Sequence, residues 1–188
     1  DPNYSTLPQQ LQKTGTTTET VFTFVMSRDT DIPAFAELAK TFNVDIVNLS
    51  FETDDYWLWC DANHSEALAV NSMMHDGIFV VASAGNQNKN GYEGYCTAGP
   101  AASASGAFTV AAYDVSHSPL NDADIESTSS RGADVNGRPI IGITAASGRE
   151  GTNSVGPGTT YSVMKTGTSF AAPLVAGASA DLKDFLID

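Results

Sequence analysis

The sequence is poor in basic side chains, and this scarcity narrows its range of partners. It holds 9 Lys and Arg against 22 Asp and Glu, which gives a formal net charge of −13. Phosphate binding needs clustered Lys and Arg, so nucleic acid is excluded as an expected partner. An acidic surface by itself has ordinary causes, chiefly solubility.

Long hydrophobic runs are also lacking. No apolar run approaches the roughly 20 residues that cross a bilayer, so no membrane span is expected. Asp1-Pro2-Asn3-Tyr4 has neither the basic start nor the apolar stretch of a signal peptide, although a mature or excised secreted protein has the same appearance. The 41% hydrophobic content excludes a disordered chain, and 188 residues allow one domain with a sizeable core.

Cysteine is scarce as well. Cys60 and Cys96 are the two cysteines, and no pair of histidines accompanies them as a zinc site would require. The residues alone leave two interpretations open. They are unrelated thiols, or they form a disulfide in an extracytoplasmic protein.

Strand-like and helix-like segments alternate along the chain. The pattern predicts strands at 21–26, 45–51, 78–84, 107–113 and 140–145, and helices from about 31, 64 and 169. Residues 1–20 form a polar lead-in, and loops are expected at 52–63, 86–104 and 147–160. Short alternation of this kind implies an α/β fold, a parallel β-sheet flanked by helices on both faces. Ligands in such sheets bind at the carboxyl ends of the strands.

Two of the predicted helices have apolar residues at helical spacing. In the first they are Phe35, Leu38, Ala39 and Phe42. In the last they are Ala171, Leu174, Val175, Ala178, Leu182, Phe185 and Leu186, and we expect this helix to lie deep, with neighbours on several sides. Pro173 fits a helix that starts near Ser169, because the N–H groups of a first turn lack intrahelical partners.

Ser169 follows Gly-Thr at the start of the last helix. The backbone N–H groups and the helix dipole favour negative charge there, which suits the oxyanion of acyl transfer. The local pattern alone favours a simpler interpretation, in which Thr168 or Ser169 only caps a buried helix.

Three segments in order resemble motifs of the subtilisin-like serine proteases (subtilases, peptidase family S8). Gly-Thr-Ser-Phe-Ala-Ala-Pro at 167–173 is similar to the nucleophile motif. Val-Val-Ala-Ser-Ala-Gly-Asn at 80–86 resembles the strand that ends in the oxyanion asparagine. Asp-Ile-Val-Asn-Leu-Ser at 45–50 looks like the strand that lines the substrate cleft. The resemblance runs from about Val21 to the C-terminus and implies a secreted endopeptidase with a protein or peptide substrate.

The resemblance assigns roles to residues of this chain. Ser169 would be the nucleophile, and the Asn86 side chain would stabilise the oxyanion together with the Ser169 N–H. The implied substrate-binding residues are Leu49, Ser50 and Phe51, which would pair with the substrate backbone, Ser83, Ala84 and Gly85, which would form one wall of the specificity pocket, and Gly99 at its base. Glu52 stands where the family usually has glycine, so substrate preference stays open.

The catalytic base of the family has no counterpart in this sequence. The family order is Asp, His, Ser, and His64, His75 and His117 lie neither in its histidine motif nor at its place in the order. We therefore interpret residues 1–188 as a single partial catalytic domain, incomplete at its N-terminal side. A missing N-terminal part of the same precursor is the expected partner and would carry the Asp and the His.

Some interpretations remain alternatives. A catalytically inactive subtilase-like module that binds peptides or acts as a scaffold would also lack the base. The acid-acting Ser-Glu-Asp relatives rank lower, because they have Asp where Asn86 stands.

The family topology favours a bridge between Cys60 and Cys96. No cofactor is assigned, and the resemblance leaves calcium open, with the acidic stretch 121–126 interpreted first as a solvated turn.

Overall fold

Four parallel strands form the central sheet of the computed structural model. The structure describes residues 11–13, 20–22, 31–51, 56–88, 96–114, 124–134, 136–147, 152–156, 159–163 and 166–187. The strands are β3 (Ile46–Leu49), β4 (Phe79–Ser83), β5 (Ala107–Tyr113) and β6 (Ile141–Ala146), and they lie in the order β3-β4-β5-β6. All three pairings are parallel, which confirms the predicted α/β sheet.

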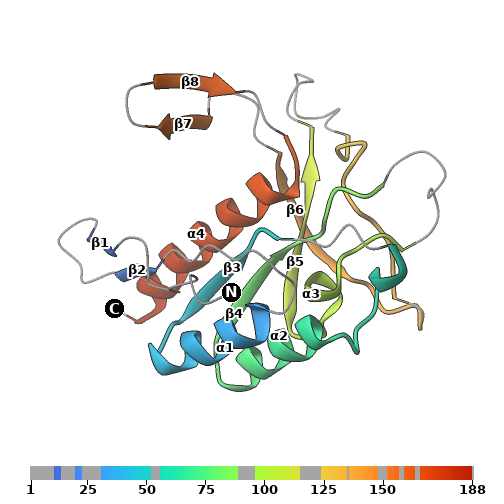
Figure 1. Ribbon diagram of the computed structural model, residues 1–188, viewed down its shortest axis with the longest axis horizontal. Coiled ribbons are helices and arrows are strands. Elements are labelled where there is room, and N and C mark those ends of the chain that lie inside the picture. The colour runs from blue at the N-terminus through green and yellow to red at the C-terminus, as the bar shows by residue number, and fades with distance from the viewer. Residues whose placement is uncertain are drawn as a thin grey trace, which may run out of the picture.

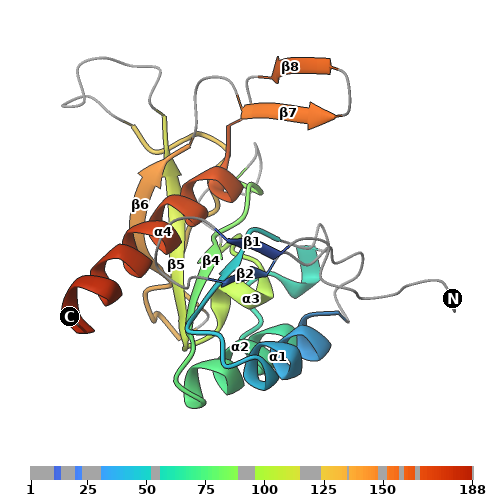
Figure 2. The same cartoon turned by 90° about the vertical axis from the view of Figure 1, so that its left-hand side faces the viewer.

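Helices cover both faces of this sheet, as predicted. They are α1 (Asp31–Thr41), α2 (Ser65–His75), the short α3 (Pro100–Ser103) and α4 (Thr168–Ile187), with a 3-10 turn, η1, at Tyr56–Leu58. In Figures 1 and 2, α4 crosses one face of the sheet while α1 and α2 lie on the other. α3 shows that the predicted loop 86–104 contains a helical turn. No helix in the described part of the chain is both long and apolar enough to span a bilayer.

Two antiparallel strand pairs lie outside the central sheet. β1 (Leu11–Lys13) pairs with β2 (Thr20–Phe22), so the start of the strand predicted at 21–26 belongs to a hairpin, and residues 23–30 lie outside the described residues. β7 (Thr152–Gly156) pairs with β8 (Thr159–Val163), so the prediction of a loop over 147–160 is wrong. The sequence of this second hairpin has β-branched and aromatic runs on either side of Gly-Pro-Gly, a combination that favours two strands and a turn.

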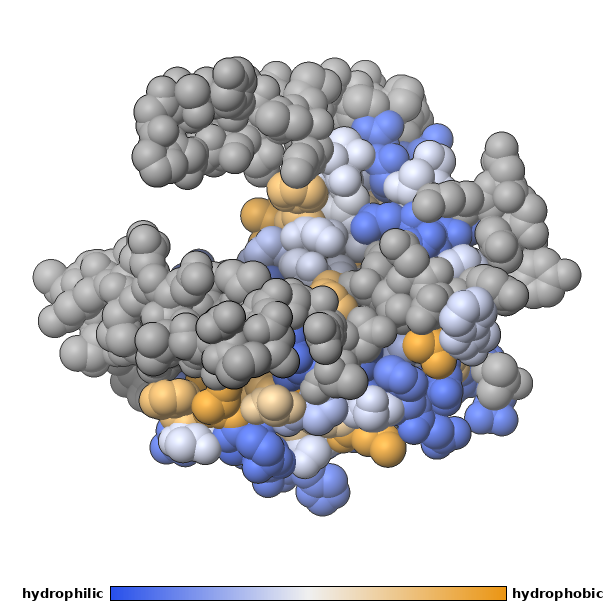
Figure 3. Space-filling model, viewed as in Figure 1, coloured by the Kyte–Doolittle hydropathy of each residue, from blue (hydrophilic) through white to orange (hydrophobic). Residues whose placement is uncertain are grey.

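The face of the sheet under α1 and α2 holds the larger core. Ile32, Ala36 and Ala39 are the buried residues of α1, whereas Phe42 is exposed, so the apolar stripe predicted for this helix is shifted. α1 packs against α2, and the small residues at 36 and 39 allow a close approach. Figure 3 shows hydrophobic residues interspersed with hydrophilic ones over this part of the surface.

The opposite face of the sheet is covered by α4 through small residues. Ala171 and Ala172 are fully buried and form a cluster with Val81, Val110 and Ala112. The larger apolar residues of α4 point outward, so the prediction that this helix is buried on several sides is wrong within this chain. These residues, which we call the outer face of α4, are Leu174, Leu182, Phe185 and Leu186, exposed by 55%, 57%, 79% and 71%.

Pro173 lies inside α4 and not in its first turn. The helix begins at Thr168, so Pro173 is its sixth residue, and the prediction that placed it in the first turn is wrong. At this depth an ordinary residue donates its N–H to the carbonyl four residues earlier, and proline cannot.

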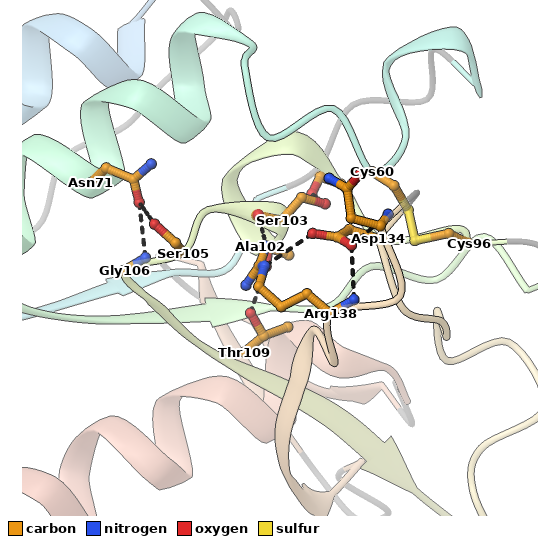
Figure 4. Close-up of polar contacts among 12 residues, drawn as sticks. Cys60, Asn71, Cys96, Ala102, Ser103, Ser105, Gly106, Thr109, Asp134 and Arg138 are labelled. Atoms are coloured by element: carbon orange, nitrogen blue, oxygen red, sulfur yellow. Dashed lines mark hydrogen bonds and ion pairs between the residues drawn. A yellow bond between two sulfur atoms is a disulfide. The ribbon is translucent and has the colours of Figure 1, made fainter.

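A disulfide joins the loop after η1 to the segment before α3. Cys60 and Cys96 are bonded, with 6.1 Å between their Cα atoms, which confirms the bridge that the family topology favours. Figure 4 shows the bridge beside the polar contacts around α3. Among these contacts, Asn71 Oδ1 accepts hydrogen bonds from Ser105 Oγ (3.0 Å) and from Gly106 N–H (2.8 Å), and so ties α2 to the start of β5.

The loop that the bridge closes predicts its effect on stability. It spans 36 residues, and the loss of chain entropy in the unfolded state corresponds to about 4 kcal/mol for a loop of this length. We expect replacement of both Cys60 and Cys96 by serine to lower the free energy of unfolding by about 2–4 kcal/mol in urea titrations. An unchanged urea midpoint in the double variant would contradict this.

Asp134 closes a turn that leads into β6. Its carboxylate accepts hydrogen bonds from the N–H groups of Asn136 and Arg138, both 2.9 Å, and from Arg138 Nε at 3.0 Å. The Arg138 guanidinium also donates to the Ser103 carbonyl of α3 at 2.6 Å (Figure 4). The Arg138 N–H is the main cause that lowers the pKa of Asp134 below its ordinary value of 3.8, with further hydrogen bonds acting in the same direction and burial opposing them.

This lowered pKa predicts a pH-dependent contribution to stability. A carboxyl group with a folded-state pKa below its unfolded value stabilises the fold above the unfolded pKa, and loses that effect as pH falls through the folded pKa. We expect Asp134→Asn to be less stable than wild type at neutral pH, and the difference to shrink as pH falls below 3.8. Thermal unfolding across pH measures it. The exposed Asp124, replaced by Asn, serves as the control, and a difference for Asp134→Asn that does not vary with pH would contradict the prediction.

Candidate active site

The predicted nucleophile, oxyanion donor and cleft strand meet at one edge of the sheet. β3 and β4 are parallel, so Ser50 and Asn86 follow their strands at the same carboxyl edge. α4 begins at this edge and packs against all four strands, which brings Ser169 there as well. Residues from three distant parts of the sequence therefore share the location where ligands of parallel α/β sheets bind.

Thr168 is the residue that joins Asn86 to the start of α4. The Thr168 N–H donates to Asn86 Oδ1 at 2.9 Å, and the Thr168 hydroxyl lies 3.3 Å from the same oxygen. The Gly85 N–H donates to Thr168 Oγ1 at 3.1 Å, and Thr168 is completely buried. These contacts turn the Oδ1 end of the Asn86 amide toward α4. The sequence indicates Thr168 only as a helix cap and does not predict that it bonds to Asn86 and Gly85. Its place in the nucleophile motif is the one signal in the sequence that points to it.

Gly167 allows the chain to approach Asn86 closely. Its φ is +136°, and a Cβ atom there would lie 2.8 Å from Asn86 Oδ1. The Gly167 N–H donates to the carbonyl of the buried Ser147 at 3.2 Å. Ser147 directly follows β6. Its hydroxyl lies 3.5 Å from Glu126 Oε2, a pairing that no pattern in the sequence indicates.

The residues expected to bind substrate lie around this junction. Ser50 Oγ donates to the Ser169 carbonyl at 3.0 Å. Leu49 is buried in the core, so only its backbone is available at the edge of the sheet, and Phe51 is half-buried. Within the described strands β3 pairs only with β4, which leaves its other edge without a strand partner.

The second group of expected substrate-binding residues is packed tightly. Ser83, Ala84 and Gly85 are all buried, and the Gly99 N–H donates to the Ala84 carbonyl at 3.3 Å, so Gly99 lies beside this segment. Ser130 also holds this segment, since its N–H donates to the Gly85 carbonyl at 2.8 Å. Nothing in the sequence Ser-Thr-Ser-Ser at 127–130 distinguishes this residue, and only the structure reveals it.

The described histidines lie away from this junction. His64 caps the N-terminus of α2, where its Nδ1 accepts the Glu66 N–H at 3.5 Å, and His75 ends the same helix. α2 lies on the face of the sheet opposite α4 (Figure 2). His117, Glu52 and residues 121–123 of the acidic stretch lie outside the described residues. In the described ranges, no three His, Cys, Asp or Glu side chains gather as a metal site.

The geometry suits the binding of a developing negative charge. A helix N-terminus presents N–H groups that lack intrahelical partners, and an amide side chain is held directly beside it.

Comparison with known proteins agrees with this arrangement, which is that of a subtilisin-like protease fold. The sequence model of the subtilase family (Peptidase_S8) matches residues 23–186. The chain therefore belongs to the subtilase family. Sequence comparison with curated proteins finds no match.

Solved structures show the same fold in longer chains. The S41 psychrophilic protease is 22% identical with a TM-score of 0.53, over 80% of this chain and 47% of its own. The patellamide maturation protease PatG is 20% identical with a TM-score of 0.57, over 84% and 42%. The self-cleaved protease domain of PatA is 27% identical with a TM-score of 0.57, over 81% and 50%. This chain thus spans half or less of the length of these relatives.

The close contact between Gly167 and Asn86 predicts that alanine is less well tolerated at position 167 than at another glycine with a positive φ. An alanine there would combine an unfavourable φ with displacement of the Asn86 side chain. We expect Gly167→Ala to lower the free energy of unfolding by about 3 kcal/mol. Gly137 also has a positive φ, +79°, but an added Cβ meets nothing within 4 Å, so Gly137→Ala should cost only about 1 kcal/mol. Equal losses in denaturant titrations would show that the contact with Asn86 is unimportant.

Proposed function

We propose that this chain is the Ser-bearing portion of a serine endopeptidase, with Ser169 as nucleophile and Asn86 in the oxyanion hole. The observation that carries the proposal is the 2.9 Å hydrogen bond from the Thr168 N–H to Asn86 Oδ1, next to Ser169. Because Oδ1 accepts the Thr168 N–H, the donor that the Asn86 amide would offer to an oxyanion is its Nδ2 group. Family membership supports the same reaction class.

The reaction follows from these two groups and a base. Ser169 Oγ attacks the peptide carbonyl while the base takes its proton, and the oxyanion that forms accepts hydrogen bonds from Asn86 Nδ2 and the Ser169 N–H. The base then protonates the leaving amine as the acyl-enzyme forms. Water, deprotonated by the same base, releases the acyl group from Ser169 and restores the hydroxyl.

The proposed base is a histidine, oriented by an aspartate, from an N-terminal part of the same precursor. The two histidines among the described residues belong to α2, on the far face of the sheet. The outer face of α4 supports a packing partner, because exposed apolar groups this close together are typical of interaction surfaces. The solved relatives, which are about twice as long, have room for such a part.

The proposed substrate is a peptide or protein that adds as a strand at the edge of β3 that pairs with no described strand. Backbone groups of Leu49, Ser50 and Phe51 would pair with it, as in other cases of strand addition. The segment Ser83, Ala84 and Gly85, with Gly99 beside it, would line the pocket for the side chain before the scissile bond. The disulfide supports a secreted or extracytoplasmic location, since such bonds persist in oxidising compartments.

A second candidate function is a peptide-binding or scaffold module without catalysis. The observation that favours it is the position of His64 and His75, remote from α4. The coding sequence upstream of Asp1 separates the two candidates. An Asp-Thr-Gly turn and a His-Gly-Thr-His helix encoded there would remove the case for the inactive module.

Phosphonylation of Ser169 tests the proposed function. We expect a fluorophosphonate to add once to the native protein when it is produced together with its upstream segment, and not to add to Ser169→Ala. Intact mass spectrometry measures the adduct. Loss of the oxyanion amide in Asn86→Ala should slow the reaction by about 10²–10³, the effect known for this asparagine in subtilisin and adopted from that relative.

Asn86→Asp is the matched control for structure. Its carboxylate keeps an oxygen that accepts the Thr168 N–H, but it lacks the Nδ2 donor. We expect the thermal midpoint of Asn86→Asp to stay closer to wild type than that of Asn86→Ala, while labelling is slowed in both. Full labelling of Asn86→Asp would exclude Asn86 as the oxyanion donor, and no adduct on the wild type would favour the inactive module.

A further inference from the structure

Pro173 creates a defect at the proposed nucleophile. In a regular α-helix the carbonyl of residue i accepts the N–H of residue i+4. For Ser169 that residue is Pro173, which lies inside α4 and has no N–H. The proline ring also crowds this carbonyl. The Ser169 carbonyl therefore cannot receive the hydrogen bond that an ordinary helix would supply.

Ser50 provides a donor at this position. Its Oγ lies 3.0 Å from the Ser169 carbonyl oxygen, although the two residues are 119 positions apart in the sequence. Ser50 directly follows β3, the strand beside which the substrate is proposed to bind.

Asn48 determines the direction in which the Ser50 hydroxyl donates. Its Nδ2 donates to Ser50 Oγ at 3.0 Å. The two residues are separated by two positions, so their side chains emerge on the same side of the extended chain. A hydroxyl has one proton and two acceptor sites. Because Asn48 occupies an acceptor site, the Ser50 proton is left to point toward the Ser169 carbonyl.

We infer that Ser50, oriented by Asn48, is a positioning residue that replaces the hydrogen bond Pro173 removes from the Ser169 carbonyl. The contact joins the first turn of α4 to the end of β3. This inference rests on the proposed function, because it takes Ser169 as the nucleophile and β3 as the strand beside which the substrate binds. On that basis the contact holds the nucleophile at a constant position relative to the bound peptide, and such alignment is a large part of catalysis. The Ser50 side chain then serves α4, and its substrate contact is through the backbone alone.

A double-mutant cycle between Ser50 and Pro173 tests the inference. Ser50→Ala should lower the thermal midpoint by about 2–4 °C, as loss of one hydrogen bond does in a chain of this size. In a Pro173→Ala background the alanine N–H restores the intrahelical bond, so Ser50→Ala should lower the midpoint by less than half as much. Ser65→Ala, at an exposed serine that begins α2, is the control and should have the same effect in both backgrounds. An equal drop for Ser50→Ala in the wild-type and Pro173→Ala backgrounds would overturn the inference.

The Ser169 carbonyl can be observed directly. Ser-Phe occurs at 50–51 and at 169–170 in the sequence and nowhere else. Labelling with ¹³C-carbonyl serine and ¹⁵N phenylalanine therefore gives two correlated NMR signals, and Ser50→Ala removes one of them. We expect the remaining Ser169 signal to move upfield in Ser50→Ala and in Asn48→Ala, and to return in Ser50→Thr, which keeps the hydroxyl. An unmoved signal in Ser50→Ala would overturn the inference.

The same variants separate this inference from the proposed function. In a protein that reacts with a fluorophosphonate, Ser50→Ala should slow labelling of Ser169 several-fold, and Pro173→Ala should restore part of the rate. If wild type does not react, the proposed function fails. The double-mutant cycle in thermal midpoints and the NMR signal of the Ser169 carbonyl still decide whether the Ser50 hydroxyl donates to that carbonyl. If wild type reacts and Ser50→Ala reacts equally fast, the positioning role is excluded although the function stands.

Discussion

The packing of α4 across the sheet is the constraint on which the site depends. Ala171 and Ala172 are small enough to let the helix lie close to Val81, Val110 and Ala112. That contact places the first turn of α4 at the carboxyl edge, where Thr168 bonds to both Gly85 and Asn86. A larger side chain at either alanine would lift the helix and break these short hydrogen bonds, because interiors are close-packed and their contacts tolerate little displacement.

The two faces of the sheet differ in how far the helices of this chain cover them. α1, α2 and α3 enclose a core with the sheet, and the disulfide and the Asp134–Arg138 turn reinforce that side. On the other face α4 is a single layer whose outer face carries four large apolar side chains. The N-terminal part proposed as the partner would cover this face, and the chain spans half or less of the length of the solved relatives.

The predicted elements that the structure confirms were those with strong local patterns. The strand over 107–113 matches β5 residue for residue, and the helices predicted from 31 and 64 are α1 and α2. The predictions that failed concern features that depend on which side chains are buried, and the spacing of apolar residues alone does not reveal this. The apolar residues of α4 were expected to be buried, but periodicity reports only that they share faces of a helix, and not which face meets the sheet. The hairpin at 152–163 contradicts the predicted loop, because glycine is typical of irregular loops and of hairpin turns alike.

The sequence by itself determined the fold class, the family and the order of the motifs, because these follow from local patterns of residue type. It also named Ser169, Asn86 and Ser50. Only the tertiary structure decided how these residues touch. The hydrogen bonds from Thr168 to Asn86 and from Ser50 to Ser169 join positions more than 80 residues apart. Such contacts depend on the register of parallel strands and on the depth of α4, and no local pattern in the chain encodes those distances.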